Sequence, residues 1–231
     1  MTIAIFHGSP RKGNTYTATK IFMDELSKYG DVRYSEFFLP NAMPEFCVGC
    51  QLCLGNPNDK CPHAQYVTPI LSEIIAADAL IITTPHYGAC SMSGCLKNLL
   101  DHLDFLTMNV APRKEMFSKK AFIISTGAGS AAAIKPIEKY LKSWGINRVC
   151  SLGVRLFTNQ WDKMPVKKQK KYEHKLCKSA QRFYNLQIKR PYLSTVLMYY
   201  MSKFILKKFV GDGNYPYEYW NERGYFKKRP F

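Results

Sequence analysis

Residues 2–15 of the chain read TIAIFHGSPRKGNT. The apolar run Thr2–His7 is typical of a buried β-strand. A turn of small and basic residues follows it, and Asn14 or Thr15 can cap a helix that continues to Tyr29. A strand, a tight turn and a helix, in this order, indicate the first unit of a parallel α/β fold.

The same alternation of apolar runs with helix-like segments continues to about residue 155. Further strands are predicted at Val32–Phe38, Ala79–Thr84, Lys120–Ser125 and Asn147–Val154. Helices are predicted between them at Val67–Ala77, Met92–Leu106 and Ala131–Trp144. Five strands separated by helices imply a parallel sheet with helices on both faces and right-handed crossovers. Because such sheets bind ligands beyond the carboxyl ends of their strands, the loops after the first four strands are candidate sites.

The last third of the chain differs from this region in charge. Residues 1–162 carry 16 Lys and Arg against 13 Asp and Glu, whereas residues 163–231 carry 17 against 4, a net charge of +13. A Lys-rich helix is predicted at Val166–Ile188, and a second helical stretch follows it. We therefore expect an α/β domain at 1–160 and a helical, basic and aromatic extension at 161–231.

The composition limits the class of protein. Apolar, aromatic and sulfur residues make up 46% of the 231 residues, enough for a sizeable core, which excludes wholesale disorder. The N-terminus lacks the pattern of a signal peptide, and lysines interrupt the apolar stretch Tyr192–Val210, so it should not span a membrane. Eight cysteines without a signal peptide favour thiol or metal chemistry over disulfides, and we expect a cytoplasmic protein.

The turn after the first strand has the composition of a phosphate-binding loop. It follows neither the GxxxxGK[ST] pattern of nucleotide triphosphatases nor the GxGxxG pattern of dinucleotide sites. Hydroxyl and amide side chains, with the backbone N–H groups of a helix start and one arginine, suit a single terminal phosphate. The candidate ligands are Ser9, Arg11, Gly13, Asn14 and Thr15. An ordinary strand-to-helix turn with a good N-cap is the alternative.

Three loops of the chain resemble those of NAD(P)H-dependent FMN reductases in the flavodoxin-like superfamily. The first is GSPRKGNT at 8–15, after the first strand. The second, after the third strand, comprises TPHYG at 84–88 and MSGCLKNLLD at 92–101, and the third is STGAGS at 125–130. The resemblance covers roughly residues 1–155, with the motifs in order and sensibly spaced.

The resemblance implies a flavodoxin-like, doubly wound sheet of five parallel strands in the order 2-1-3-4-5, with FMN bound at one edge. The first loop corresponds to the phosphate site, the second lies against the isoalloxazine ring and the third closes its other side. The residues carried over for the second and third loops are Pro85, His86, Tyr87, Gly88, Thr126, Gly127 and Gly129. His86 stands where an apolar or small residue is more common, and it either packs on the ring or donates a proton near it.

A cysteine-rich loop at 47–61 follows the second strand and has the spacing CxxCxxCx7C. Its candidate metal ligands are Cys47, Cys50, Cys53 and Cys61. The first three can hold one side of a [4Fe–4S] cluster, and the fourth returns across a polar turn at 55–59. The spacing resembles that of iron-sulfur flavoproteins; four structural thiols and a zinc ion are the alternatives. Because the loop follows a strand, we expect it at the same edge of the sheet as the flavin.

The extension contains two further patterns. Apolar residues recur at helical spacing between Leu193 and Ile205, with lysines beside them, in a stretch that ends near Gly211. Packing on the domain or on a second subunit is the preferred interpretation, and contact with a membrane surface stays open. The aromatic tail after Asp212 resembles that of clostridial-type flavin oxidoreductases and should cover a groove on its own subunit or a partner's. The apolar and aromatic surface of segment 190–231 predicts a homodimer or tetramer, and without a recognised motif no nucleic-acid partner is expected.

Together these features predict an FMN-dependent NAD(P)H oxidoreductase that reduces a quinone, a flavin, a nitro compound or a redox protein. The flavin carries the hydride chemistry, so the sequence nominates no catalytic side chain. The alternative is a flavodoxin-type electron carrier without enzymatic activity. The net charge of +16 counts against a carrier, because small flavodoxins are usually acidic, and it also attracts the phosphates of NAD(P)H.

Overall fold

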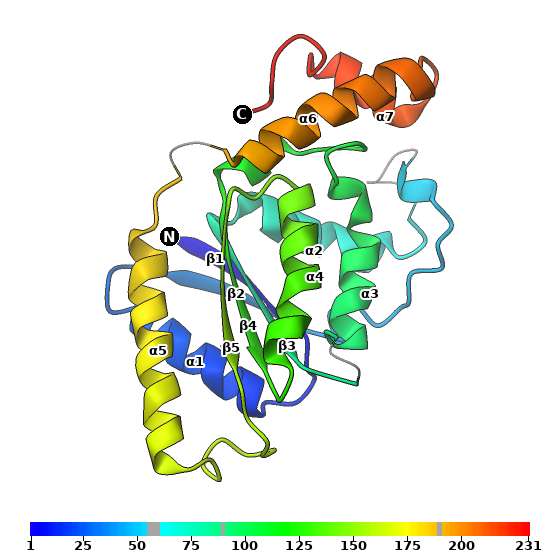
Figure 1. The fold of residues 1–231 in the computed structure, drawn as a ribbon. Helices are drawn as coiled ribbons and strands as arrows, with labels where there is room; N and C mark the ends of the chain where they lie inside the picture. The colour runs from blue at the N-terminus through cyan, green and yellow to red at the C-terminus, as the bar shows by residue number, and fades with distance from the viewer. Residues whose placement is uncertain (55–60, 89–90, 189–190) are drawn as a thin grey trace.

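A five-stranded parallel sheet forms the centre of the protein. The computed structural model describes residues 1–54, 61–88, 91–188 and 191–231. The strands lie in the order β2-β1-β3-β4-β5 (Figure 1), which confirms the predicted doubly wound α/β fold and its strand order. Their bounds are β1 Thr2–His7, β2 Arg33–Phe38, β3 Ala79–Pro85, β4 Lys120–Thr126 and β5 Arg148–Val154.

Helices cover both faces of the sheet because its central strands have apolar side chains on both sides. Successive residues of a strand point to opposite faces, so Ile3 and Ile5 belong to one core cluster and Ala4 and Phe6 to the other. The first cluster includes residues of α1 and α5, and the second includes residues of α2, α3 and α4. The bounds of these helices are α1 Asn14–Leu26, α2 Ala64–Ala76, α3 Gly94–His102, α4 Ser130–Ser143 and α5 Val166–Asn185.

The predicted helices are present, but some of their ends differ from the prediction. The ends of α2 and α5 are displaced by less than one helical turn. α3 ends at His102 and not at Leu106. Phe105 and Leu106 are fully buried in a separate 3-10 turn, so the apolar pattern continues past the end of the helix and made the prediction too long. A helix in the aromatic tail, α7 (Tyr215–Glu222), was not predicted, although Pro216 in its first turn favours a helix start.

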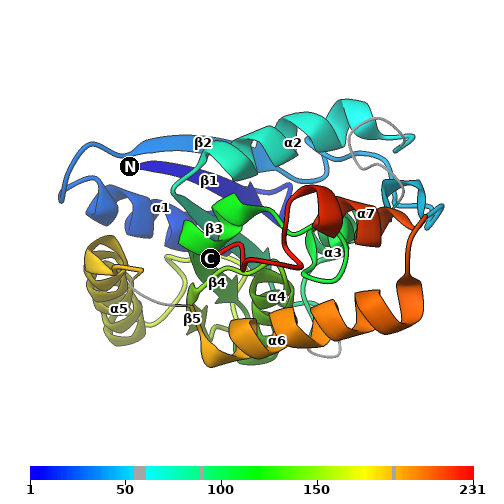
Figure 2. The same ribbon diagram turned by 90° about the horizontal axis from the view of Figure 1, so that it is seen from above.

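The part of the extension after α5 packs against the end of the sheet where the strands begin. α6 (Leu193–Ile205) continues into the π-helical turn η4 (Leu206–Val210), and α7 lies beside them (Figure 2). Trp220 is fully buried and stacks on Tyr199, whose hydroxyl donates to the carbonyl of Tyr225 at 2.7 Å. The aromatic tail therefore covers a groove on its own subunit and joins the core that contains α2, α3 and α4.

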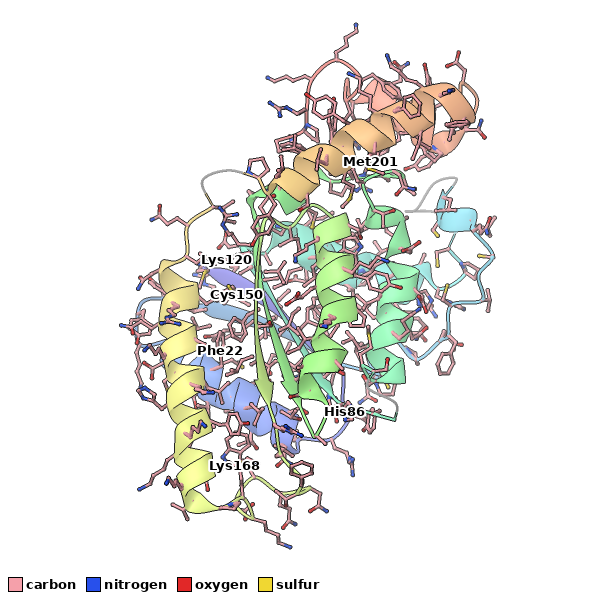
Figure 3. The ribbon with its side chains drawn as sticks, in the orientation of Figure 1. Phe22, His86, Lys120, Cys150, Lys168 and Met201 are labelled. Carbon is pink, nitrogen blue, oxygen red and sulfur yellow. The ribbon has the colours of Figure 1, made fainter. Side chains whose placement is uncertain are left out.

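A buried lysine attaches the first helix of the extension to the sheet. Lys120 of β4 donates through Nζ to the carbonyl oxygens of Phe183, Tyr184 and Leu186 at 2.6, 2.9 and 3.1 Å (Figure 3). These carbonyls lie at the C-terminal end of α5, where the helix dipole favours a positive charge. Burial lowers the pKa of Lys120 from its ordinary value, and the three acceptors stabilise its charged form.

Part of the cysteine-rich loop, including the polar turn predicted at 55–59, lies outside the described residues. That turn therefore stays a prediction. Among the helices that are described, none is long and apolar enough to cross a membrane.

Replacing Trp220 with Ala tests how strongly the tail stabilises the domain. The change leaves a cavity in place of a fully buried indole, so we expect the free energy of unfolding to fall by about 3–5 kcal/mol. Denaturant unfolding followed by circular dichroism measures this loss. Phe209→Ala removes an exposed ring from the same extension and should change the free energy by less than about 0.5 kcal/mol. Equal losses in the two variants would contradict the packing role of Trp220.

Candidate functional site

A pocket lies at the edge of the sheet where the strands end. Its volume of about 410 Å³ falls in the range of small-molecule sites, about 300–1,000 Å³. The loops after β1, β3, β4 and β5 contribute to its walls, so segments far apart in the sequence meet here. The predicted FMN-site residues that line this flavin pocket, as we call it from its predicted ligand, are Ser9, Arg11, Gly13, Asn14, Thr15, Pro85, His86, Tyr87, Thr126 and Gly127.

The start of α1 provides polar groups to this pocket. Thr15 Oγ1 lies 2.7 Å from Thr126 Oγ1, and this hydrogen bond joins the first loop to the third. Asn14 donates through Nδ2 to the carbonyl of Thr158 at 2.7 Å, whereas its buried Oδ1 has no hydrogen-bond partner among the described residues. The first N–H groups of a helix have no intrahelical acceptor, and the helix dipole favours an anion beside them. The arrangement therefore suits a negatively charged ligand.

His86 packs against the backbone of the third loop. A Cβ atom added at Gly129 would lie 2.4 Å from His86 Nε2, and one added at Gly127 would lie 3.0 Å from His86 Cβ, so glycine permits this close approach. The N–H of His86 donates to the carbonyl of Thr126 at 2.8 Å. Its Nε2 is buried and, within the described part of the chain, has no hydrogen-bond partner. Gly129 and Gly88 do not line the pocket, although the sequence predicts both as site residues.

The loop after β5 completes the pocket, and the prediction from sequence did not include it. This loop contributes Leu156, Thr158, Asn159 and Gln160. The carboxyl end of β5 meets the same edge as those of the other strands, so the parallel topology itself was the available signal. Lys12 was also missed; its ammonium lies 5.3 Å from the ring centroids of Tyr16 and Phe38 and adds a second cation to the pocket beside Arg11.

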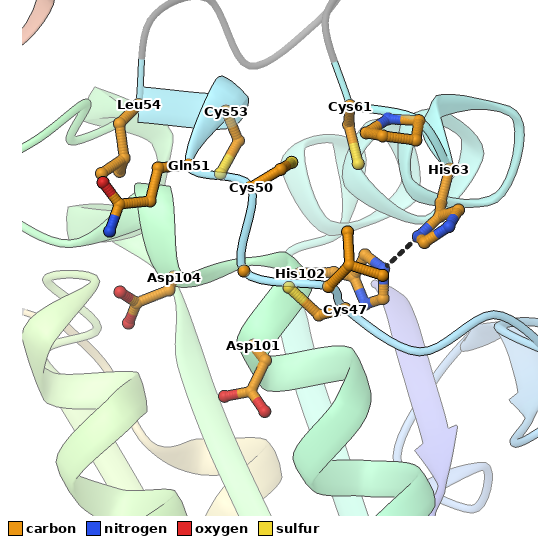
Figure 4. Close-up of a pocket in the computed structure, with 13 residues that line it drawn as sticks. Cys47, Cys50, Gln51, Cys53, Leu54, Cys61, His63, Asp101, His102 and Asp104 are labelled. Atoms are coloured by element: carbon orange, nitrogen blue, oxygen red, sulfur yellow. Dashed lines mark hydrogen bonds between the residues drawn. The ribbon is translucent and has the colours of Figure 1, made fainter.

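A second pocket, of about 190 Å³, contains the cysteine-rich loop (Figure 4). All four predicted metal ligands line this cysteine pocket: Cys47, Cys50, Cys53 and Cys61. Burial, together with the other three thiols of the loop, raises the pKa of Cys53. Neighbouring thiolates repel one another, and a bound cation would remove this repulsion. The donor set therefore fits a thiolate-bound metal centre.

Two histidines stand at the edge of the cysteine pocket. His102 Nδ1 donates to the carbonyl of Asn98 at 2.9 Å, so in the neutral ring Nε2 accepts the hydrogen bond from His63 Nδ1, also at 2.9 Å. Burial lowers the pKa of His102, which favours this neutral form. One nitrogen of each histidine and the sulfur of Cys61 lie within 4.8 Å of one another, close enough to share an ion. Neither histidine was predicted from the sequence, because their separation along the chain matches no motif.

The cysteine pocket does not lie at the predicted edge of the sheet. Asp101 and His102, in the last turn of α3, line it. The flavin pocket lies toward the other end of α3, where Ser93 caps the helix. The start of the loop after β1 is close to this end, because a Cβ atom added at Gly8 would lie 2.8 Å from Ser93 Oγ. α3 has nine residues, which separates its two ends by about 12 Å. The expectation that both sites share one edge is therefore wrong.

Asn98, in the middle of α3, explains the path of the cysteine-rich loop. Its Oδ1 accepts a hydrogen bond from the N–H of Cys47 at 2.9 Å, and its Nδ2 donates to the carbonyl of Glu45 at 2.8 Å. A second, longer hydrogen bond of 3.4 Å reaches the carbonyl of Met43. These contacts hold the chain along α3, so the loop leaves the edge where β2 ends.

The fold and the flavin pocket together define a flavodoxin-like α/β protein with a ligand site at the carboxyl ends of its strands. Residues 1–164 match the family described as NADPH-dependent FMN reductase, and the chain belongs to this family. The resemblance noted in the three loops is thereby confirmed.

The chain is also similar to individual proteins. An iron-sulfur flavoprotein of Archaeoglobus fulgidus is 27% identical over 134 residues, which cover 58% of this chain and 63% of that protein. An iron-sulfur flavoprotein of Methanocaldococcus jannaschii is 33% identical over 95 residues, 41% of this chain and 46% of that protein. The matches thus span less than two thirds of either relative. The solved NAD(P)H:quinone oxidoreductase from Methanothermobacter marburgensis has a TM-score of 0.63 at 16% identity, covering 80% of this chain and 97% of that one, and shows the shared fold.

Replacing Asn98 with Asp tests whether this side chain holds the cysteine-rich loop. Asp cannot donate to the carbonyls of Glu45 and Met43, so we expect the free energy of unfolding to fall by about 1–3 kcal/mol. Urea unfolding measures the change. The new carboxylate can still accept from the N–H of Cys47, so hydrogen exchange there should be faster only because the two lost contacts loosen the loop. Asn41→Asp makes the same substitution at an exposed position and should leave both quantities unchanged. A loop that exchanges at the original rate in Asn98→Asp would show that other contacts hold it.

Proposed function

We propose that the chain is an FMN-dependent NAD(P)H oxidoreductase that holds FMN in the flavin pocket. The observation that carries this proposal is the meeting of two cations and a helix start in one pocket. Arg11 and Lys12 line it beside the start of α1, whose first N–H groups have no intrahelical acceptor. These groups favour a ligand with an anionic group, such as a terminal phosphate. Membership of the FMN reductase family supports FMN as that ligand.

In this proposal, each loop binds a different part of FMN. The loop 9–15 holds the phosphate of FMN with hydroxyl groups, the guanidinium of Arg11 and the N–H groups at the start of α1. Pro85, His86 and Tyr87 from one loop, and Thr126 and Gly127 from another, would hold the isoalloxazine ring. FMN supplies the hydride chemistry when it is bound. The side chains bind it, orient it and exclude water, and no protein acid or base is required.

NAD(P)H is the proposed electron donor. Arg11 and Lys12 line the pocket, and the chain has a net charge of +16, so the phosphates of a nicotinamide nucleotide are attracted to it. The proposed acceptor is a quinone, a flavin, a nitro compound or a redox protein. The eight cysteines suit a reducing compartment, and we propose the cytoplasm.

A flavodoxin-type electron carrier is the second candidate, and the cysteine pocket is the observation that favours it. A metal cluster in the same chain as a flavin suits the passage of single electrons between proteins. Oxidation of NADH and NADPH by the FMN-loaded protein, with a small quinone as acceptor, separates the two functions. An enzyme turns over repeatedly and saturates with the nicotinamide, whereas a carrier reacts only when a partner reductase is added.

The first test of the proposed function identifies the cofactor and its phosphate ligand. Heat should release FMN, identified by mass, and release of FAD would contradict the proposal. Arg11→Ala should raise the dissociation constant of FMN by about 10- to 150-fold, the equivalent of about 1.5–3 kcal/mol for a charged hydrogen bond. Arg33→Ala, at an exposed arginine where β2 begins, is the matched control and should bind FMN normally. An unchanged constant for Arg11→Ala would remove Arg11 from the site.

We also propose that the cysteine pocket holds a [4Fe–4S] cluster. The four cysteines line one pocket, and two relatives of the chain are named iron-sulfur flavoproteins. Among the described residues, the group of ligand atoms within 4.8 Å of one another includes Cys61 but none of the other three cysteines. A single zinc ion, at about 2.3 Å from each sulfur, would hold its thiolates closer together than this. The arrangement of the four sulfur atoms therefore does not match a single zinc ion bound by all of them.

Anaerobic reconstitution with iron and sulfide tests the cluster. The unmodified protein should take up about four irons per chain, and Cys50→Ser should take up markedly fewer, because it removes one thiolate ligand. Cys177→Ser changes a cysteine of α5 and is the matched control, with iron uptake as in the unmodified protein. Equal iron in all three proteins would leave the loop with four structural thiols and no cluster.

A further inference from the structure

The outer face of α6 and η4 is an apolar surface that no described part of the chain covers. Large apolar side chains there are between 40% and 73% exposed. They form what we call the α6 patch: Leu193, Leu197, Tyr200, Met201, Phe204, Ile205 and Phe209. Isolated apolar residues are normal on a protein surface, but a continuous patch on one helix indicates a binding partner.

The patch reverses the usual arrangement of a surface helix. A helix on a globular protein turns its apolar side chains to the core and its polar ones to water. The buried side chains of α6 are Thr195, Tyr199 and Ser202, all with a hydroxyl group, whereas the large exposed ones are leucine, isoleucine, methionine and aromatic. Figure 2 shows α6 along one margin of the molecule, with α7 and the chain end on its other side. The outer face is therefore directed away from the rest of the subunit.

Positive charges accompany the patch, and no negative charge does. Residues 193–210 read LSTVLMYYMSKFILKKFV, with three lysines and neither Asp nor Glu. Lys207 and Lys208 are exposed, and the ammonium of Lys208 lies 5.3 Å from the ring centroid of Phe204 and 5.5 Å from that of Phe209. A partner that covers this surface must therefore be apolar in its interior and negatively charged at its surface.

We propose that the α6 patch binds the surface of an anionic membrane. Contact between two copies of the patch would bring the lysines of two chains, each with a net charge of +16, toward one another. An anionic bilayer instead offers headgroups to the lysines and acyl chains to the leucine, methionine and phenylalanine side chains. Charge complementarity thus favours lipid over a second copy of the chain, the occupant that the homodimer prediction for segment 190–231 would give.

The dimensions fit a helix that lies on the bilayer. α6 has 13 residues and η4 has five, which together extend about 27 Å. In the plane of the membrane, Tyr200, Phe204 and Phe209 occupy the interfacial region that aromatic rings prefer. The lysine stems cross the apolar edge and place their ammonium groups at the phosphate level. No described helix crosses a membrane, so the protein rests on the surface without spanning it.

Membrane binding would also orient the protein. Met201 of the patch and His86 of the flavin pocket lie toward opposite ends of the molecule (Figure 3). The flavin pocket therefore faces the aqueous side when the patch is on lipid. This consequence rests on the proposed function, since it makes a water-soluble molecule or a protein the electron acceptor. The membrane contact itself does not depend on FMN.

Vesicle flotation with the full-length protein tests the proposal. The vesicles are phosphatidylcholine alone, or phosphatidylcholine mixed with an equal part of phosphatidylglycerol. We expect binding to the anionic vesicles, much weaker binding to the neutral ones, and release by high salt. Combining Leu197→Ser, Met201→Ser and Phe204→Ser should abolish binding. Combining Lys207→Gln and Lys208→Gln should weaken binding to the anionic vesicles by about fivefold per lysine.

Matched controls change equivalent side chains elsewhere on the surface. Phe157→Ser replaces an exposed phenylalanine of the loop after β5, and Lys170→Gln with Lys171→Gln removes two exposed lysines of α5. Both controls should bind vesicles as the unmodified protein does. Thermal unfolding followed by circular dichroism should show the same Tm for every variant, because all the changed side chains are at the surface.

Sedimentation velocity without lipid tests whether a second copy of the chain, and not lipid, covers the α6 patch. The proposal would be overturned if the unmodified protein did not bind anionic vesicles. If it is instead a dimer that the triple serine variant dissociates, the patch is an interface between copies of the chain. Loss of vesicle binding in the control variants would overturn the proposal as well, because general positive charge would then account for the effect. FMN content is measured separately, so a failure of the proposed function is recognised independently.

Discussion

A parallel sheet is stable only when both of its faces are covered, and this requirement arranges the rest of the molecule. β4 is buried along its whole length and β3 at every position but the last. One face therefore takes α1 and α5, and the other takes α2, α3 and α4. The helices leave the edge at the carboxyl ends of the strands open, and the loops that meet there form the flavin pocket. α5 becomes part of this cover because Lys120, within the sheet, binds its last carbonyl groups.

Features set by local sequence could be predicted, and features set by distant contacts could not. Apolar runs such as Thr2–His7 predict the strands, and the loops after these strands predict the flavin pocket. The path of the cysteine-rich loop depends on Asn98, which is 51 residues from Cys47, so sequence order alone placed it at the wrong end of α3. The position of the tail likewise depends on how Trp220 packs against Tyr199, and a run of aromatic residues does not show which groove it fills.

The two long helices of the basic extension, α5 and α6, differ in which of their side chains are buried. α5 turns Leu176, Ala180 and Phe183 inward, so most of its lysines form an ordinary solvated face. α6 has fewer lysines and turns its apolar side chains outward. Both helices contribute to the same net charge of +13 over residues 163–231, yet only α6 combines charge with an uncovered apolar surface. Charge alone gives solubility and long-range attraction, whereas the combination defines a surface that binds.

α3 connects the two candidate sites and fixes the distance between them. At its first end, the N–H of Ser93 donates to Thr84 Oγ1 at 2.9 Å and ties the helix to the strand beside the flavin pocket. Toward its other end, Asn98 and His102 lie one turn apart on the same side and contact the cysteine-rich loop and His63. A hydrogen-bonded helix resists compression far better than a loop does, so the separation between the pockets is set by a rigid element.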